Sequence, residues 1–199
     1  AGNGGKAVCN SHITEEITEY PLLRSRLWAA LNFFVNFCIL GESFPEFLTY
    51  INGGIVCTEL RTSGGAHTAD SFGIGTCGGN GGSVTINGGT IIAEASSSAI
   101  SSGRGGSITI NGGTVKASSE GDGFGIGGAG VHHTAEMHIT INDGNIETTA
   151  NRNNAAIGDK SKQKSSVTIT GGVIHAVGKG SAAGIGSTGD IRITGGEIT

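Results

Sequence analysis

The sequence predicts an all-β fold, a parallel β-helix in which short strands repeat from coil to coil. The leading observation is a motif of isoleucine, a polar residue and a glycine turn, whose copies lie 35, 24, 31, 28 and 24 residues apart. Self-similarity at a period of about 20 to 50 residues is typical of stacked architectures. The motif isoleucines are Ile51, Ile86, Ile110, Ile141, Ile169 and Ile193.

The first predicted strand of each unit has one apolar and one polar face. In the unit of Ile110, Ile108 is the second apolar residue, and Ser107, Thr109 and Asn111 are the polar residues around them. Alternation with a period of two indicates a strand with a buried face and a solvated face. The polar columns on this strand and just after it include Thr85, Asn87, Thr109, Asn111, Thr140, Asn142 and Thr168.

Two further strands complete the predicted unit. A glycine pair follows the motif polar residue and supplies a turn, because glycine accepts positive φ without steric cost. The next strand carries Val115 inward, and a third apolar point recurs as Ile126 in the same unit. We therefore expect Ile110, Val115 and Ile126 to point inward from three faces of one coil.

Residues 47–199 are expected to form a β-helix of about five to six coils at the strand spacing of about 4.8 Å. We favour the right-handed form, because the left-handed form usually shows a strict hexapeptide repeat and the spacings here vary. An antiparallel sandwich is the main rival. It explains the glycine turns but not the recurrence of the same residue types at three points of every unit.

The first 46 residues do not fit the repeat and are predicted to contain a helix at about 21–40. Pro21 suits the first helical turn, Trp28 lies in the apolar run, and Gly41 is placed to end the helix. The mainly apolar run of fourteen residues, 27–40, reaches about 21 Å of a roughly 30 Å hydrocarbon layer, so no membrane span is predicted. We expect this helix to be a cap or insertion that covers the solenoid core.

The motifs Gly106-Ser107-Ile108-Thr109-Ile110 and Ala183-Gly184-Ile185-Gly186 resemble the glycine-rich repeats "GxITIxGGxVxA…GAGIGG" of large secreted or wall-attached proteins of Gram-positive bacteria. Those repeats are commonly described as carbohydrate-binding or adhesin-like. The resemblance covers roughly residues 47–199. It implies a secreted or cell-surface structural or adhesive module, and it leaves the ligand open.

Composition and cysteine spacing favour no cofactor. A net charge of −4 gives no electrostatic footprint for nucleic acid. Cys9, Cys38, Cys57 and Cys77 show no CxxC spacing, so no zinc or other metal site is predicted. The cysteines fit one or two disulfides as well as they fit reduced thiols.

Asp70 and Asp122 are the candidate catalytic pair. Each lies four residues before a third-strand isoleucine, which places them two coils apart, roughly 10 Å at the strand spacing. That separation suits an inverting glycosidase. Ser96 occupies the same column between them, however, and aspartate at a corner is an ordinary turn residue. A glycoside hydrolase or lyase is therefore the alternative to a non-enzymatic protein.

The stacked Thr and Asn columns named above are the preferred binding surface, because they present hydroxyl and amide groups at regular steps of about 4.8 Å. Such an array suits a repeating polymer, here a polysaccharide or glycan surface, and ice is a third reading. Tyr50 and Arg192 interrupt the threonine column, which weakens the ice reading. Solvent-facing strands also favour threonine without any ligand.

The predicted function is a structural scaffold or an adhesive, carbohydrate-binding module that is secreted or attached to the cell surface. Ile191 to Thr199 form a final strand without a capping segment in this sequence. Because an unpaired strand edge invites association, we expect the chain either to self-associate through its coil ends or to belong to a longer solenoid.

Overall fold

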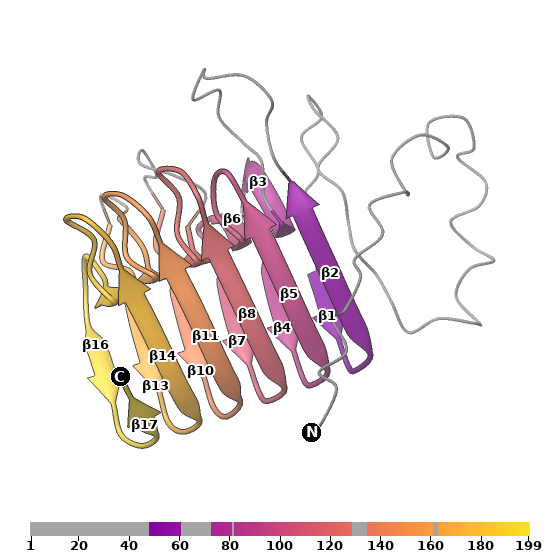
Figure 1. Cartoon of the computed structure of the whole chain (residues 1–199). Helices are drawn as coiled ribbons and strands as arrows, with labels where there is room; N and C mark the ends of the chain where they lie inside the picture. Colours follow the sequence, from indigo (N-terminus) through magenta and orange to yellow (C-terminus); the bar gives the residue numbers. More distant parts are fainter. Residues whose placement is uncertain (1–47, 61–72, 81, 129–134, 161–162) are drawn as a thin grey trace, which may run out of the picture. The chain divides into compact units, whose positions relative to one another are not determined.

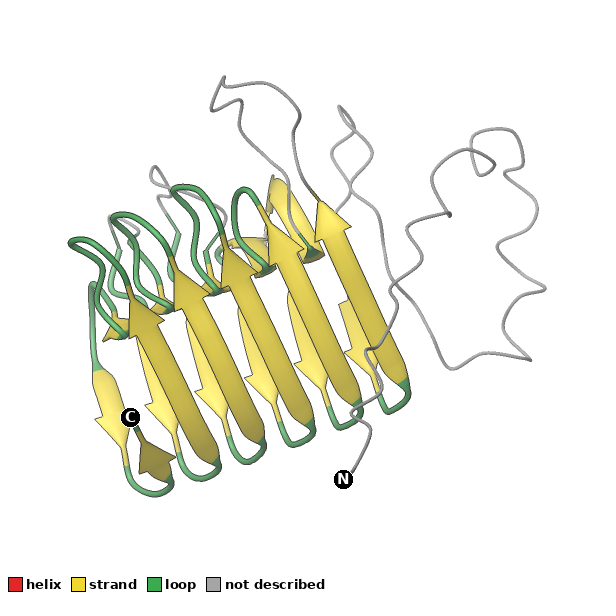
Figure 2. Cartoon of the chain, viewed as in Figure 1, coloured by secondary structure: helices red, strands yellow, loops and turns green. Residues whose placement is uncertain are grey.

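The computed structural model describes residues 48–60, 73–80, 82–128, 135–160 and 163–199. These residues belong to one compact unit, Asn32–Thr199. They form strands and connecting loops, and this part of the chain contains no helix (Figure 2). The predicted segment 1–46 with its helix at 21–40 lies outside the described residues, and so does Asp70.

Three parallel sheets run along the stack of coils. Sheet A contains β1 (Leu48–Ile51), β4 (Ser83–Ile86), β7 (Ser107–Ile110), β10 (His138–Ile141), β13 (Ser166–Ile169) and β16 (Ile191–Ile193). Sheet B contains β2 (Ile55–Leu60), β5 (Thr90–Ala95), β8 (Thr114–Ser119), β11 (Asn145–Ala150), β14 (Val173–Gly178) and β17 (Glu197–Ile198). Sheet C contains β3 (Ile74–Asn80), β6 (Ile100–Arg104), β9 (Ile126–Gly127), β12 (Ile157–Gly158) and β15 (Ile185–Gly186).

Each strand pairs with the equivalent strand of the next coil, and the strands of sheets A and B lie side by side in chain order (Figure 1). The pairing is parallel and keeps the motif isoleucines in register, as in Ile86 with Ile110 and Ile110 with Ile141. The parallel β-helix is therefore confirmed, and the antiparallel sandwich is excluded. The right-handed form stays a prediction.

The core consists of the inward columns of the three sheets. Ile110, Val115 and Ile126 are each 0% exposed, and they lie on β7, β8 and β9. The inward positions of one coil therefore meet as predicted. Burial of β-branched side chains in each coil supplies the main favourable free energy, because a fully buried Ile or Val side chain contributes about 1.5–3 kcal/mol.

The turn between sheets A and B needs glycine at its second glycine position. Gly113 has a φ of 96°, and the equivalent glycines of the other coils also have positive φ. A Cβ atom on Gly113 would lie 2.7 Å from the carbonyl oxygen of Gly89 in the preceding coil. Both the backbone conformation and the close stacking of coils therefore explain why this position is glycine.

Among the described residues, no helix has the length and apolarity that a bilayer span requires.

Candidate functional site

The threonine column of sheet A is a continuous outward row. Thr85 pairs with Thr109, Thr109 with Thr140, and Thr140 with Thr168. Their side chains are half-buried, while the isoleucines next to them are fully buried. The structure therefore brings the four predicted threonines together at the step of adjacent parallel strands, about 4.8 Å.

The threonine hydroxyls of this column are not used within the fold. Within the described part of the chain, no hydrogen bond joins the hydroxyl of Thr85, Thr109, Thr140 or Thr168 to another protein group. A hydroxyl offers one donor and two acceptor positions. The column therefore presents hydroxyls that remain available to solvent or to a ligand.

The asparagine column is connected in a different way. Asn87 Nδ2 donates to Asn52 Oδ1, Asn111 Nδ2 to Asn87 Oδ1, and Asn142 Nδ2 to Asn111 Oδ1, each at 2.7 Å. We call this row the asparagine ladder. Asn87 and Asn111 thus each use one donor and one acceptor on neighbouring asparagines, and Asn142 uses one donor in the same way. Each amide nitrogen keeps a second N–H, so an outer ligand contact remains available.

Thr170 extends the ladder, and the sequence analysis did not identify it. Its hydroxyl donates to Asn142 Oδ1 at 3.1 Å. The signal was present in the alignment of the repeats, since Thr170 follows Ile169 as Asn111 follows Ile110. A hydroxyl can replace an amide at this end because only one hydrogen bond is required there.

The outer face of sheet A carries little charge. On the four strands β4, β7, β10 and β13, seven of the eight outward residues are Ser or Thr, and the eighth is His138. The Nδ1 atom of His138 lies 2.9 Å from the hydroxyl oxygen of Ser166. Tyr50, which is 50% exposed, pairs with Thr85 at one end of the threonine column, and Arg192 pairs with Thr168 at the other.

The outer face of sheet B has a different character. Lys116 Nζ lies 2.9 Å from Glu147 Oε2, and both side chains are more than half exposed. The hydrogen bond from Lys116, together with its charge, holds the pKa of Glu147 below its ordinary value, and the charge of His175 acts in the same direction. Serine and threonine therefore dominate the outer face of β4, β7, β10 and β13, whereas the outer face of sheet B carries the Lys116–Glu147 ion pair.

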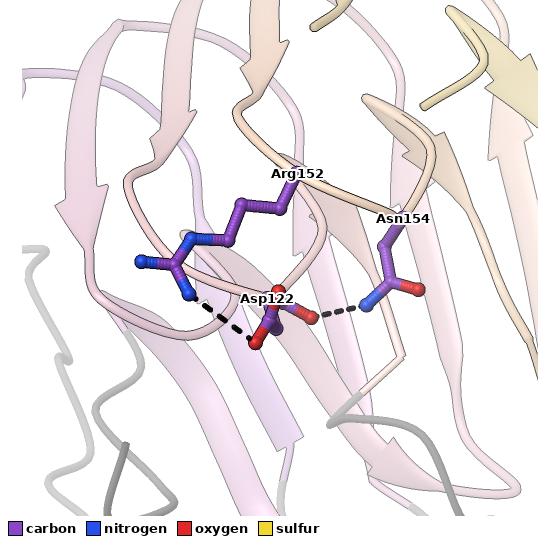
Figure 3. A network of polar contacts seen from close by, with 3 residues as sticks. All are labelled: Asp122, Arg152 and Asn154. Carbon is purple, nitrogen blue, oxygen red and sulfur yellow. Dashed lines mark hydrogen bonds and ion pairs between the residues drawn. The ribbon is translucent and has the colours of Figure 1, made fainter. Parts of the chain in front are cut away.

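Asp122, the described member of the candidate catalytic pair, is an exposed residue of the loop between β8 and β9 (Figure 3). Arg152 Nη1 is 3.6 Å from its Oδ2 atom, and Asn154 Nδ2 donates to its backbone oxygen. Arg152 and Asn154 belong to the loop of the next coil, between β11 and β12. Asp122 thus joins the loops of two coils, and its distance to Asp70 lies outside the described residues.

A second acid lies inside the solenoid. Asp159 is 5% exposed, and its Oδ2 atom accepts a hydrogen bond of 2.6 Å from the Ser165 hydroxyl, which accepts one of 3.0 Å from the backbone N–H of Met137. These bonds connect the two ends of the segment between β12 and β13 to the residue that precedes β10 in the neighbouring coil. Among the described residues, no group of three or more His, Cys, Asp or Glu side chains is placed to hold a metal ion.

Comparisons with known proteins agree with the fold. A family model for a β-helix repeat matches residues 84–104, 108–130 and 167–190. Each matched segment begins at a buried sheet A residue, namely Val84, Ile108 or Val167. Comparisons with curated proteins and with solved structures give no match. The matched repeats and the parallel sheets that they build show that the chain is a β-helix repeat protein.

Proposed function

We propose that this β-solenoid is a secreted or cell-surface scaffold whose sheet A face binds a polysaccharide without cleaving it. The observation that carries the proposal is the threonine column, Thr85, Thr109, Thr140 and Thr168, because its hydroxyls have no partner among the described protein groups. The asparagine ladder borders this column and contributes its remaining N–H groups. Self-association through the coil ends stays a prediction.

The chemistry of the face favours an uncharged, extended chain of sugars. Sugar hydroxyls both donate and accept, as threonine and serine hydroxyls do. Seven of the eight outward residues on β4, β7, β10 and β13 are of this kind. The exposed ring of Tyr50 at the end of the column offers an apolar surface with a polar tip, which suits stacking against a sugar ring.

Repetition compensates for weak single contacts. Four successive coils contribute the same threonine hydroxyl, so a polymer that advances along the stack meets four equivalent contacts. Linked contacts raise the effective concentration of the next one, and the overall affinity then exceeds that of any single step. A polymer is therefore a better ligand for this face than a free monosaccharide.

The two other readings predict different properties. A polysaccharide hydrolase or lyase would use Asp70 and Asp122, but Asp122 is engaged with Arg152 and with the loop of Asn154. Ice binding would use the same threonines. His138 in the adjoining column, with Tyr50 and Arg192 at the ends, makes the face less regular than a crystal lattice requires.

The test is a glycan array with the purified chain, followed by titration calorimetry with soluble neutral and acidic polysaccharides. We expect binding to a neutral linear polymer, weakened about tenfold in Thr109→Val with Thr140→Val, and also in Tyr50→Ala but less in Tyr50→Phe. Lys116→Ala on sheet B is the matched control and should bind as the unmodified chain does. Failure of every glycan to bind would refute the proposal.

The enzymatic alternative is tested with the same polymers. We expect no release of reducing or unsaturated sugar ends. Turnover that disappears in Asp122→Asn would replace the non-enzymatic proposal with the enzymatic one.

A further inference from the structure

Three ladder asparagines are each followed by glycine, in Asn52-Gly53, Asn87-Gly88 and Asn111-Gly112, whereas Asn142 is followed by Asp143. An Asn-Gly pair is prone to spontaneous deamidation, because glycine has no side chain that blocks the approach of its backbone nitrogen to the asparagine side chain. Here the ladder asparagines are also exposed to solvent. The sequence therefore places reactive pairs in a row along the stack.

The reaction needs only water. The backbone nitrogen of the glycine attacks Cγ of the preceding asparagine and forms a C–N bond. The Cγ–Nδ2 bond breaks, and Nδ2 leaves as ammonia with the proton of the backbone amide. Water then opens the succinimide ring and leaves aspartate or isoaspartate, each with one new negative charge.

The glycine nitrogens are not protected by backbone hydrogen bonds. Among the described residues, the N–H groups of Gly88 and Gly112 donate no backbone hydrogen bond, in contrast to the neighbouring Asn87 and Asn111, which donate to Ile51 and Ile86. Outside the chain neighbours, a Cβ built on Gly88 would meet only the backbone oxygen of Asn52 at 3.8 Å, and one built on Gly112 only that of Asn87 at 3.5 Å, so both glycines have open space beside them. Protection must therefore come from the asparagine side chains.

The ladder provides that protection. The amides of Asn87 and Asn111 are each held by two hydrogen bonds of 2.7 Å, one through Nδ2 and one through Oδ1. Both bonds lie along the stack. Rotation of either amide away from this direction breaks these bonds, so the ladder restricts the conformations from which the carbonyl carbon can approach the glycine nitrogen.

We infer that deamidation is coupled along the asparagine ladder in one direction. Deamidation of one asparagine removes a hydrogen bond from the asparagine of the preceding coil and accelerates its deamidation, but it leaves the asparagine of the following coil bonded. The direction follows from the donors and acceptors. An aspartate at position 87 has no N–H to donate to Asn52 Oδ1, so Asn52 loses its partner. The aspartate still accepts from Asn111 Nδ2, so Asn111 remains held.

The direction can be measured in two single variants of the full chain, Asn87→Asp and Asn111→Asp. The chains are incubated at mildly alkaline pH, and deamidation at each site is followed by peptide mapping with mass spectrometry. In Asn87→Asp we expect Asn52 to deamidate about fivefold faster, the factor that corresponds to one lost hydrogen bond, with Asn111 unchanged. In Asn111→Asp we expect the same acceleration at Asn87, with Asn52 unchanged.

Two controls separate the ladder from general loosening of the fold. Thr109→Val lies beside the ladder without bonding to it and should leave all three rates unchanged. In concentrated urea the substitutions should have no effect on the other sites. Acceleration on the following side, on both sides or on neither would overturn the inference.

A measurement on the chain without substitutions tests the coupling between sites even if a variant unfolds. After ageing of the folded protein, fragmentation of intact molecules shows which sites are modified together. We expect molecules modified at both Asn52 and Asn87 to exceed the number expected from independent events. Independent modification would contradict the inference.

Discussion

The threonine column and the asparagine ladder lie on the same coils and differ in what stacking does to them. Thr109 and Asn111 flank the buried Ile110, and both are polar. Asn111 bonds to asparagines of both neighbouring coils at 2.7 Å, whereas the Thr109 hydroxyl has no partner among the described protein groups.

The difference comes from side-chain length and chemistry. Adjacent coils are separated by about 4.8 Å. An amide carries a donor and an acceptor on separate atoms and can bridge that step to another amide or, as at Thr170, to a hydroxyl, whereas the short branched side chains of two stacked threonines do not bond to each other. The same stacking therefore produces a self-satisfied row from asparagine and an available row from threonine.

We expect the largest effect on stability at Ile110, the buried residue between the two columns. Ile110→Asp would bury an unpaired charge in the core, and we expect it to lower the free energy of unfolding by several kcal/mol. Urea denaturation measures this. An unchanged unfolding midpoint would show that Ile110 does not face the core, and the assignment of both flanking columns would fail with it.

A smaller loss is expected in the ladder. Asn111→Ala removes the bonds to Asn87 and Asn142, and we expect a destabilisation of about 1–2 kcal/mol. Water replaces part of the lost bonding because the site is exposed. Measured by the same denaturation, a value near zero would mean that the ladder contributes nothing to the stacking of coils.

In the threonine column we expect substitution to affect polysaccharide binding rather than stability. We expect Thr109→Val to change stability by no more than about 0.5 kcal/mol, because the hydroxyl makes no hydrogen bond to a described protein group and valine keeps the shape. Polysaccharide binding should fall instead, as measured by calorimetry. A clear loss of stability without a change in binding would assign the column a structural role like that of the ladder.

The smallest effect is expected on the charged face of sheet B. Because the pKa of Glu147 is lowered in the folded chain, its pairing stabilises the protein above the ordinary carboxyl pKa, and this contribution is lost as pH falls through the lowered value. Both side chains are exposed, so the contribution is at most about 0.5 kcal/mol. Carboxyl NMR titration of Lys116→Ala should show a higher Glu147 pKa, and an unchanged titration would rule out the pairing.

Several parts of this molecule were predictable from short-range patterns. The inward columns represented by Ile110, Val115 and Ile126 follow from alternation within one strand and from repetition between coils. The positive φ of Gly113 follows from the turn between two strands. Both depend on residues that are close in sequence.

Contacts between loops were not predictable in this way. Arg152 and Asn154 contact Asp122 from the loop of the next coil, and the loops differ in length from coil to coil. Their partners therefore do not recur at a fixed spacing. The role of Thr170 in the ladder was missed for a related reason, since residue type alone did not indicate which atoms would meet.

The sequence by itself determined the parallel solenoid, its three apolar columns and its glycine turns, because these depend on local alternation and on a repeated pattern of burial. Only the tertiary structure decided which polar column is bonded internally and which remains open. That outcome depends on whether side-chain atoms of one coil come within hydrogen-bond distance of those of the next, about 4.8 Å away along the stack. An alignment of the repeats does not give such interatomic distances. Asn111 and Thr109 are both polar residues beside Ile110, but only the Asn111 amide forms hydrogen bonds to the neighbouring coils.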